Sequence, residues 1–316
     1  MKRKQTSTAA DAAKLTAGRP FTWNKAWTLH LMILPGLLAL LIFSYLPMAG
    51  LVIAFQDFKP WLGVTGSQWV GLDNFRMMFD RPDSIQVIWN TLIISSTKII
   101  AAPLSSIGFA LLLNEVRMIF FKRAVQTLVY LPHFLSWVIL GGILIEVLSN
   151  AGLVNRALQW MLGVDNIPFL MNGNWFRFTV VVSDVWKEFG FGAIVFLAAL
   201  TGINPSLYEA AEIDGASRWR QTLAITLPGI MPIIVLMFTL SLGNVLNAGF
   251  DQIFNMYNSL VYDKADIIDT FVYRTGILGG GMGFATAVGM FKSVVGLILI
   301  VLSYRLAYKI ADYRIF

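Results

Sequence analysis

Ionisable side chains lie inside an apolar stretch of this chain, between residues 178 and 201. Asp184 and Glu188 are four residues apart and would share one face of a helix. Charged groups within a membrane are costly, so they indicate a functional pathway by default. With Trp186, they could pair hydroxyl groups and stack against the ring faces of a polar ligand. Alternatively, Asp184 and Lys187 could form a buried ion pair that only packs helices.

A second polar group lies at the end of the apolar run 229–250. Its members are Asn244, Asn247, Asp251, Gln252, Asn255 and Tyr257. Asn244, Asn247 and Asp251 recur at i, i+3 and i+7, which predicts one polar stripe on a helix. Such a stripe would be expensive against lipid. It must therefore line a ligand path or its outer gate, or join this helix to another protein chain.

Several kinds of chemistry are excluded by what the sequence lacks. The chain has no cysteine and only two histidines, so neither a thiolate site nor an H-E-x-x-H zinc hydrolase is expected. Gly279-Gly280-Gly281 is not followed by Gly-Lys-Ser/Thr, so the chain has no P-loop there. We expect no catalytic residues and no metal site.

The elements that must position these residues are membrane spans. The chain is 57% hydrophobic and 13% charged, and several apolar runs reach the roughly 20 residues that cross a bilayer. We predict an all-α polytopic membrane protein with an uncleaved first span. The six expected spans are 30–55, 88–113, 125–149, 178–201, 229–250 and 285–308. Lys98 and Lys292 would snorkel or pair inside the bundle.

Basic residues indicate the orientation of these spans. If the N-terminus lies inside, the inner segments hold 14 Lys and Arg residues and the outer segments hold 7, with three more inside spans. Since basic residues are enriched on the cytoplasmic side, both termini are predicted to be cytoplasmic. The polar segment around Glu209 is then cytoplasmic as well.

That cytoplasmic segment, residues 202–228, is expected to form two short helices. Asn204-Pro205-Ser206 is a helix-start signal, and Ser206 with Glu209 also fits a capping box. Gly215 supplies a turn. A second helix over 216–226 should stop at Leu227-Pro228. The result is a compact knob that suits insertion into a cleft on a partner protein, and Arg218 and Arg220 would contact that partner or lipid head groups.

The same segment resembles the EAA loop of ABC importer permeases. The family pattern is Glu-Ala-Ala, three residues, Gly, nine residues, Ile, one residue, Leu-Pro. It is matched here by Glu209-Ala210-Ala211, Gly215, Ile225 and Leu227-Pro228. The resemblance implies the type I importer permease fold of the maltose-type family. It also implies a coupling role for Glu209, Ala210, Ala211, Asp214, Gly215, Ala216, Leu227 and Pro228.

A finer resemblance concerns residues 249–255, with Asn258 and Asp269-Thr270. They are similar to the LplB-like subgroup, which imports complex oligosaccharides. The resemblance implies a sugar permease of the bacterial cytoplasmic (inner) membrane that works by alternating access. Its partners would be a second homologous permease, two ATPase subunits and an extracytoplasmic sugar-binding protein. ATP and Mg would bind the ATPase, with no cofactor in this chain.

The expected organisation is a cytoplasmic tail (1–28), a six-helix permease domain (29–308) and a second tail (309–316). One alternative is an ion-coupled secondary transporter that uses Asp184 and Glu188. Another is an intramembrane protease, although neither Gly-x-Gly-Asp nor Gly-x-Ser-x-Gly is present. Dependence of uptake on ATP rather than on an ion gradient separates the importer from the ion-coupled transporter.

Overall fold

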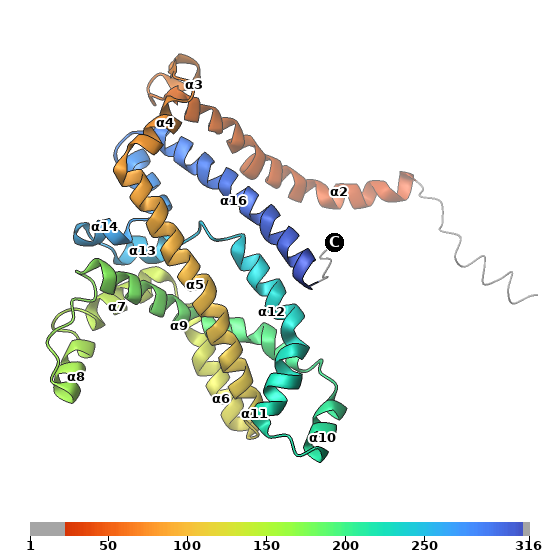
Figure 1. Ribbon diagram of the computed structural model, residues 1–316. Coiled ribbons are helices and arrows are strands. Elements are labelled where there is room, and N and C mark those ends of the chain that lie inside the picture. Colours follow the sequence, from red (N-terminus) through yellow and green to blue (C-terminus); the bar gives the residue numbers. More distant parts are fainter. Residues whose placement is uncertain (1–22, 312–316) are drawn as a thin grey trace, which may run out of the picture. The chain divides into compact units, whose positions relative to one another are not determined.

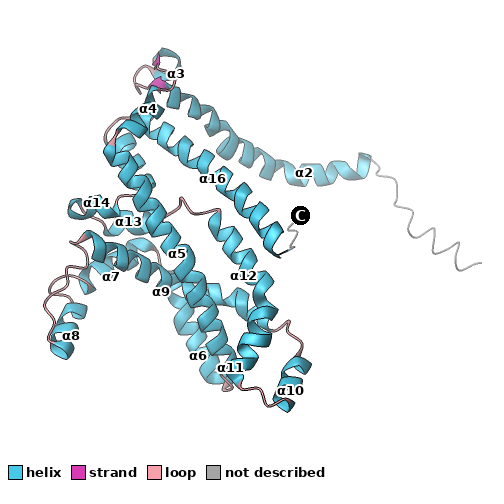
Figure 2. Ribbon diagram, viewed as in Figure 1, coloured by secondary structure: helices cyan, strands magenta, loops and turns pink. Residues whose placement is uncertain are grey.

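The computed structural model describes residues 23–311, and the chain divides into two units, residues 1–52 and residues 53–316. Residues 1–22 and 312–316, which make up most of the two predicted tails, lie outside the described part. Among the described residues nearly all regular structure is helical, and one pair of two-residue strands is the exception (Figure 2).

The first unit is one apolar helical run. α2 (Trp23–Leu40) continues through a π-helical turn (Leu41–Tyr45) into a 3-10 helix (Leu46–Phe55), whose last residues belong to the second unit. Leu29–Phe55 has 27 residues and is long and apolar enough to cross a bilayer. This run coincides with the predicted first span.

In the second unit, α5 (Pro82–Glu115) and α9 (Gly173–Leu200) lie side by side (Figure 1). They approach closely because small residues lie between them. A Cβ atom on Gly192 would lie 2.6 Å from Ser106 Oγ, so a larger residue does not fit there. These helices contain the predicted spans 88–113 and 178–201.

The predicted third span, 125–149, is not one straight helix. The segments Ile119–Phe134 and Trp137–Val147 are bent by 101° at a short break. α6 (Ile119–Tyr130) ends in a 3-10 turn (Leu131–Phe134) that contains Pro132, and Ser136 caps the next helix, α7 (Trp137–Val147). Proline cannot continue an α-helical ladder, and serine is a preferred N-cap, so the break has a local cause.

The fifth span also differs from its prediction, at both ends. α11 (Arg218–Gln221) passes through a π-helical turn (Thr222–Thr226) directly into α12 (Leu227–Leu242), so the predicted stop at Leu227-Pro228 is wrong. Pro228 lies in the first turn of α12, and the wider π turn before it accommodates the proline. The helix ends at Leu242, before the predicted residue 250, and the chain turns at Gly249, where φ is +95°.

Short helices make up the segment between the fifth and sixth spans. They are α13 (Phe250–Met256), a 3-10 turn (Ser259–Val261), α14 (Tyr262–Ala265), α15 (Ile268–Val272) and a π-helical turn (Tyr273–Leu278). Side chains of the spans hold this segment by its backbone. Asn90 Nδ2 donates to the Asp266 carbonyl at 3.0 Å, and Arg177 Nε donates to the Lys264 carbonyl at 2.8 Å. α16 (Met282–Ala311) follows and contains the last apolar span, Met282–Arg305.

The segment between the first span and α5 is small. β1 (Gln56–Asp57) pairs antiparallel with β2 (Gln68–Trp69) around α3 (Gly63–Gly66), and α4 (Asp73–Asp80) leads into α5. Asn74 Nδ2 donates to the carbonyls of Ala54 and Gln56 at 2.9 and 3.0 Å, which fixes α4 against the strand pair.

Candidate functional site: an exposed loop and a polar cavity

The loop that carries Glu209 begins where the fourth span ends. α10 (Pro205–Ile213) is bent by 76° from α9. Asn204 caps it, because its Oδ1 accepts a hydrogen bond from the Ser206 amide at 3.1 Å. Ser206 therefore lies inside the helix, and the predicted capping box of Ser206 with Glu209 is wrong. Gly215, with φ at +72°, makes the predicted turn.

Two polar contacts tie this loop to the adjoining helices. Tyr208 Oη lies 2.9 Å from Thr226 Oγ1, which joins α10 to the π-helical turn before α12. Arg218 Nη1 donates to Glu115 Oε2 at 3.0 Å, which joins α11 to the end of α5. A polar cavity of about 280 Å³ lies between these contacts. The loop is therefore connected to the second and fifth spans as well as to the fourth.

The outer surface of the loop is both acidic and apolar. The exposed predicted residues are Glu209, Ala210, Asp214, Gly215 and Pro228, whereas Ala211, Ala216 and Leu227 are half-buried, and Glu212 between them is exposed as well. Ile213 is 87% exposed and Leu207 is 50% exposed. The sequence analysis missed these two apolar side chains, although a single isoleucine inside an acidic loop is a usable signal.

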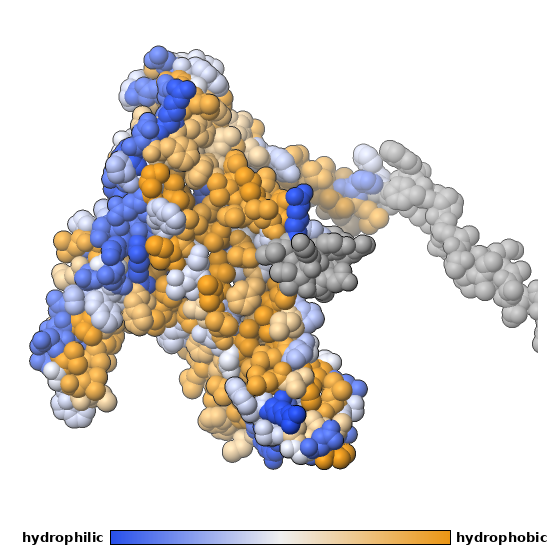
Figure 3. Space-filling model, viewed as in Figure 1, coloured by the Kyte–Doolittle hydropathy of each residue, from blue (hydrophilic) through white to orange (hydrophobic). Residues whose placement is uncertain are grey.

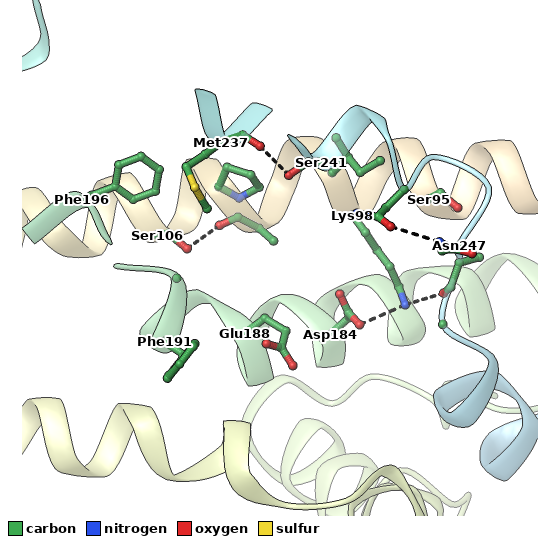
Figure 4. A pocket seen from close by; sticks show the side chains of 17 residues that line it. Ser95, Lys98, Ser106, Asp184, Glu188, Phe191, Phe196, Met237, Ser241 and Asn247 are labelled. Atoms are coloured by element: carbon green, nitrogen blue, oxygen red, sulfur yellow. Dashed lines mark hydrogen bonds and ion pairs between the residues drawn. The ribbon is translucent and has the colours of Figure 1, made fainter. Parts of the chain in front are cut away.

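A cavity lined by both polar and apolar side chains, called the polar cavity below for its hydrogen-bonding groups, lies between α5, α9 and α12 (Figure 4). Its volume is about 390 Å³. Of the predicted path residues, it brings together Asp184, Glu188, Asn244 and Asn247. Its other polar lining comes from Ser95, Lys98, Ser106 and Ser241. Hydroxyl, amide and carboxylate groups thus face one space inside the apolar helices.

Lys98 is the centre of the polar contacts at one end of this cavity. Its Nζ donates to Asp184 Oδ1 at 3.1 Å, to the Ala248 carbonyl at 2.8 Å and to Gln252 Oε1 at 2.5 Å. A lysine ammonium has three N–H donors, and all three are used here. Lys98 therefore joins α5 to α9 and to the segment around Gly249. The predicted buried pair of Asp184 with Lys187 is wrong, because Lys98 takes that place.

Gln252 completes the same junction but does not line the cavity. It is 0% exposed, and its Nε2 donates to the Val180 carbonyl at 2.8 Å and to Ser183 Oγ at 2.9 Å. A buried amide with all these contacts made is a strong cross-link between segments. The geometry gives Gln252 a structural position instead of the predicted one in a ligand path.

A second ionic cluster surrounds Glu188 at the break in the third span. Lys187 Nζ donates to Glu188 Oε1 at 3.0 Å and to the His133 carbonyl at 2.8 Å. His133 Nδ1 lies 2.8 Å from Glu188 Oε2, and the His133 ring stacks on Phe191 with centroids 3.9 Å apart. The sequence analysis missed His133, because 55 residues separate it from Glu188 and only the folded chain joins them.

Three predicted path residues lie away from the cavity. Trp186 is two residues from Asp184 on a helix, so it points to the other side of α9, into an apolar groove of about 600 Å³. Asp251 is exposed on α13, and Asn255 Nδ2 donates back to the Asp251 carbonyl at 2.7 Å. The predicted stripe of Asn244, Asn247 and Asp251 is wrong, because the helix ends at Leu242 and Asp251 belongs to another helix.

Four described helices, or up to six if each bent pair counts as one span, could cross a membrane. With a polar cavity inside them, they define a multi-pass membrane permease. The chain belongs to the family of binding-protein-dependent transport system inner membrane components, whose model matches residues 104–316. It is therefore the membrane component of an ABC importer, a transport subunit in the inner membrane.

Relatives of known sequence cover nearly the whole chain. Protein LplB of Bacillus subtilis (strain 168) is 45% identical over 296 residues, which cover 92% of this chain and 92% of LplB. The polygalacturonan/rhamnogalacturonan transport system permease protein YteP of the same organism is 44% identical over 289 residues, which cover 91% of this chain and 90% of YteP.

A solved structure matches the fold over a similar length. It is the crystal structure of a bacterial ABC transporter involved in the import of the acidic polysaccharide alginate. The matched chain has a TM-score of 0.84 and 40% identity, with 91% of this chain and 97% of that chain covered. The predicted fold class and the predicted ABC permease class are confirmed, and nothing in the comparisons supports the ion-coupled alternative.

Proposed function

We propose that this chain imports oligosaccharides released from polysaccharides, as one half of a membrane pathway completed by a second homologous permease. The polar cavity inside the apolar helices carries this proposal, because sugars need hydroxyl, amide and carboxylate partners when they leave water. YteP is named for polygalacturonan and rhamnogalacturonan transport, and the matched solved transporter for alginate import. These names favour substrates that carry uronic acids.

Within this chain, the pathway residues are those that face the cavity: Asp184, Glu188, Asn244 and Asn247. Each carboxylate has a lysine partner, Lys98 for Asp184 and Lys187 for Glu188. The paired groups leave the cavity with nearly balanced charge, which suits a hydroxyl-rich ligand better than a free metal cation. Trp186, Asp251, Gln252 and Asn255 are assigned to packing around the pathway.

Transport is driven by two ATPase subunits that bind ATP and Mg, and residues 202–228 couple this chain to one of them. Glu209, Ala210, Asp214 and Gly215 are exposed on the loop and would face the ATPase. The conformation of the loop would be maintained by Ala211, Ala216, Leu227 and Pro228. When the ATPases close, the loop transmits their movement through α10 to the spans and opens the cavity outward.

An extracytoplasmic sugar-binding protein then delivers the ligand. A second crystal structure of the alginate transporter contains an alginate pentasaccharide-bound periplasmic protein.

We propose the same division into two tails and one permease domain that the sequence predicts. Residues 1–28 and 309–316 are cytoplasmic tails, and residues 29–308 form the permease domain. The excess of Lys and Arg on the side of the Glu209 loop supports both termini in the cytoplasm. Cysteine labelling from either side of the membrane tests this orientation, because the native chain contains no cysteine.

One experiment tests coupling and transport together. The chain is purified with its ATPase, second permease and binding protein, and uptake of oligogalacturonides is measured in proteoliposomes with ATP or with an imposed ion gradient. We expect uptake with ATP only. Gly215→Pro, which cannot adopt a positive φ, and Glu209→Lys should lose the ATPase or its sugar-stimulated hydrolysis. Normal coupling in both variants, or uptake driven by the gradient alone, would contradict the proposal.

A further inference from the structure

One helix of the outer side has no role in the proposed pathway. α8 (Leu153–Leu162) connects the broken third span to α9, and its ten residues are only about 15 Å long, too short to cross a membrane. Glycines fix its two ends. A Cβ atom on Gly152 would lie 2.4 Å from the Val147 carbonyl oxygen, and Gly163 ends the helix with φ at +63°.

A buried asparagine holds α8 in one orientation. Asn155 is 1% exposed, and its Nδ2 donates to the carbonyls of Ser149 and Ile167, both at 3.0 Å. Its Oδ1 accepts from the Ile167 amide at 2.9 Å. Val154 and Leu158 pack on the neighbouring apolar core. The rotation of α8 about its own axis is therefore set by the fold.

The face that remains outside is apolar. Leu153, Ala157, Trp160 and Met161 recur at i, i+4, i+7 and i+8, which is one side of a helix. Trp160 is 86% exposed, and Leu153 and Met161 are 71% and 70% exposed. In Figure 3 the end of the molecule that carries α8 is orange on one side and blue on the opposite side. The helix thus has a packed face, an exposed apolar face, and a polar edge formed by Arg156 and Gln159.

We propose that α8 lies in the outer lipid interface of the membrane, with this apolar face in the boundary between head groups and acyl chains. The lipid surface is favoured because α8 follows α7 after a turn of residues 148–152, and Val138, Ile139 and Ile143 of α7 are exposed apolar groups on the bent third span. A tryptophan and an arginine beside such a face match the interfacial region, where Trp lies at the head-group level and Arg meets phosphate. α8 then anchors the outer half of the broken third span.

Site-directed spin labelling of the whole transporter in nanodiscs tests this proposal. Because the native chain has no cysteine, Ala157→Cys, Met161→Cys and Gln159→Cys each introduce one labelling site in it, once any cysteines of the partner chains are replaced. Gln159 is the matched control, on the same helix but on the polar edge. Collisions of each nitroxide with oxygen, which partitions into lipid, and with a water-soluble nickel chelate are measured by electron paramagnetic resonance.

The nitroxides at positions 157 and 161 are expected to collide with oxygen severalfold more often than with the nickel chelate. The nitroxide at position 159 is expected to collide more often with the nickel chelate. Equal access of the nickel chelate to all three positions would overturn the proposal in favour of an aqueous face. Exclusion of both reagents, or a change when the binding protein is added, would overturn it in favour of a protein partner. Elution of each labelled transporter as an intact complex in size-exclusion chromatography shows that the variants are folded, and neither this control nor the collision measurement depends on sugar uptake by the wild type.

Discussion

The Lys98 ammonium lies 3.1 Å from the Asp184 carboxylate, although 86 residues separate them in the chain. The two side chains extend from α5 and α9, and Lys98 also donates to the carbonyl of Ala248 in the turn that follows the fifth span. One buried cation thus joins two membrane helices and this turn beside the polar cavity (Figure 4). Removing either charge leaves the other without its ionic partner.

The first prediction concerns this pair. Lys98→Met or Asp184→Ala should destabilise the folded transporter by about 3–5 kcal/mol, because each leaves an uncompensated buried charge. The double variant Lys98→Met/Asp184→Ala should be more stable than the sum of the single changes predicts. Thermal inactivation in nanodiscs, followed by size-exclusion chromatography, measures the difference. Additive losses would show that the pair contributes nothing beyond its separate hydrogen bonds.

The second prediction concerns the apolar end of the coupling loop. Ile213→Asp should weaken ATPase binding by about tenfold or more, because an exposed apolar side chain that fills a pocket of a partner contributes about 1.4 kcal/mol or more. Leu260→Asp is the matched control, since Leu260 is also exposed but belongs to the 3-10 turn Ser259–Val261 in the segment that joins the fifth and sixth spans. Affinity is measured by titrating ATPase onto the permease pair in nanodiscs. Equal affinities of both variants and the wild type would remove Ile213 from the interface.

The third prediction distinguishes binding of the ATPase to the loop from transmission of the ATPase movement to the spans. Tyr208→Phe removes the hydroxyl that lies 2.9 Å from Thr226 Oγ1 and should cost about 1 kcal/mol at this joint. We expect unchanged ATPase binding but fewer sugar molecules transported for each ATP hydrolysed. Thr226→Val should have the same effect, and the double variant should add little to either single change. A loss of ATPase binding in Tyr208→Phe would instead place this tyrosine in the docking surface.

The fourth prediction concerns the contact of α6 with α9. A Cβ atom on Gly190 would lie 2.5 Å from both Val129 Cγ1 and the Val129 carbonyl oxygen, so Gly190→Ala forces the helices apart. Overpacking of this kind typically costs about 1–3 kcal/mol. Gly108→Ala on α5 is the control, because its Cβ atom would meet nothing within 4 Å. The two variants are compared by the temperature at which half of the protein aggregates. A melting point for Gly190→Ala equal to that of the control would mean that α6 is free to shift.

Features set by neighbouring residues could be predicted from the sequence. Asn204-Pro205 begins α10 and Gly215 ends the loop turn, because capping and positive φ are local properties. The long apolar runs likewise revealed the spans. The break at Pro132 was missed because the residues on both sides remain apolar, so hydropathy alone does not register it.

The polar cavity could be predicted only in part. Asp184 and Glu188 were found because charge is rare within a span, but their partners Lys98 and His133 come from other helices. The asparagine stripe failed because helical spacing was assumed to continue beyond Leu242. Gln252 is buried at the Lys98 junction instead of lining the cavity for the same reason, since the turn at Gly249 resets the direction of the chain.

The π-helical turn at Thr222–Thr226 sets the rotational phase between the coupling loop and the fifth span. A π turn holds one residue more than an α-helical turn, and one residue is about 100° of rotation in an α-helix. Met237 and Ser241 of α12 face the cavity only in the present phase. Deleting one residue from this turn would keep every side chain of α10, α11 and α12, but would rotate Met237 and Ser241 away from the cavity. A single backbone irregularity therefore sets how the proposed coupling loop and the proposed ligand path are rotated relative to one another about the helix axis.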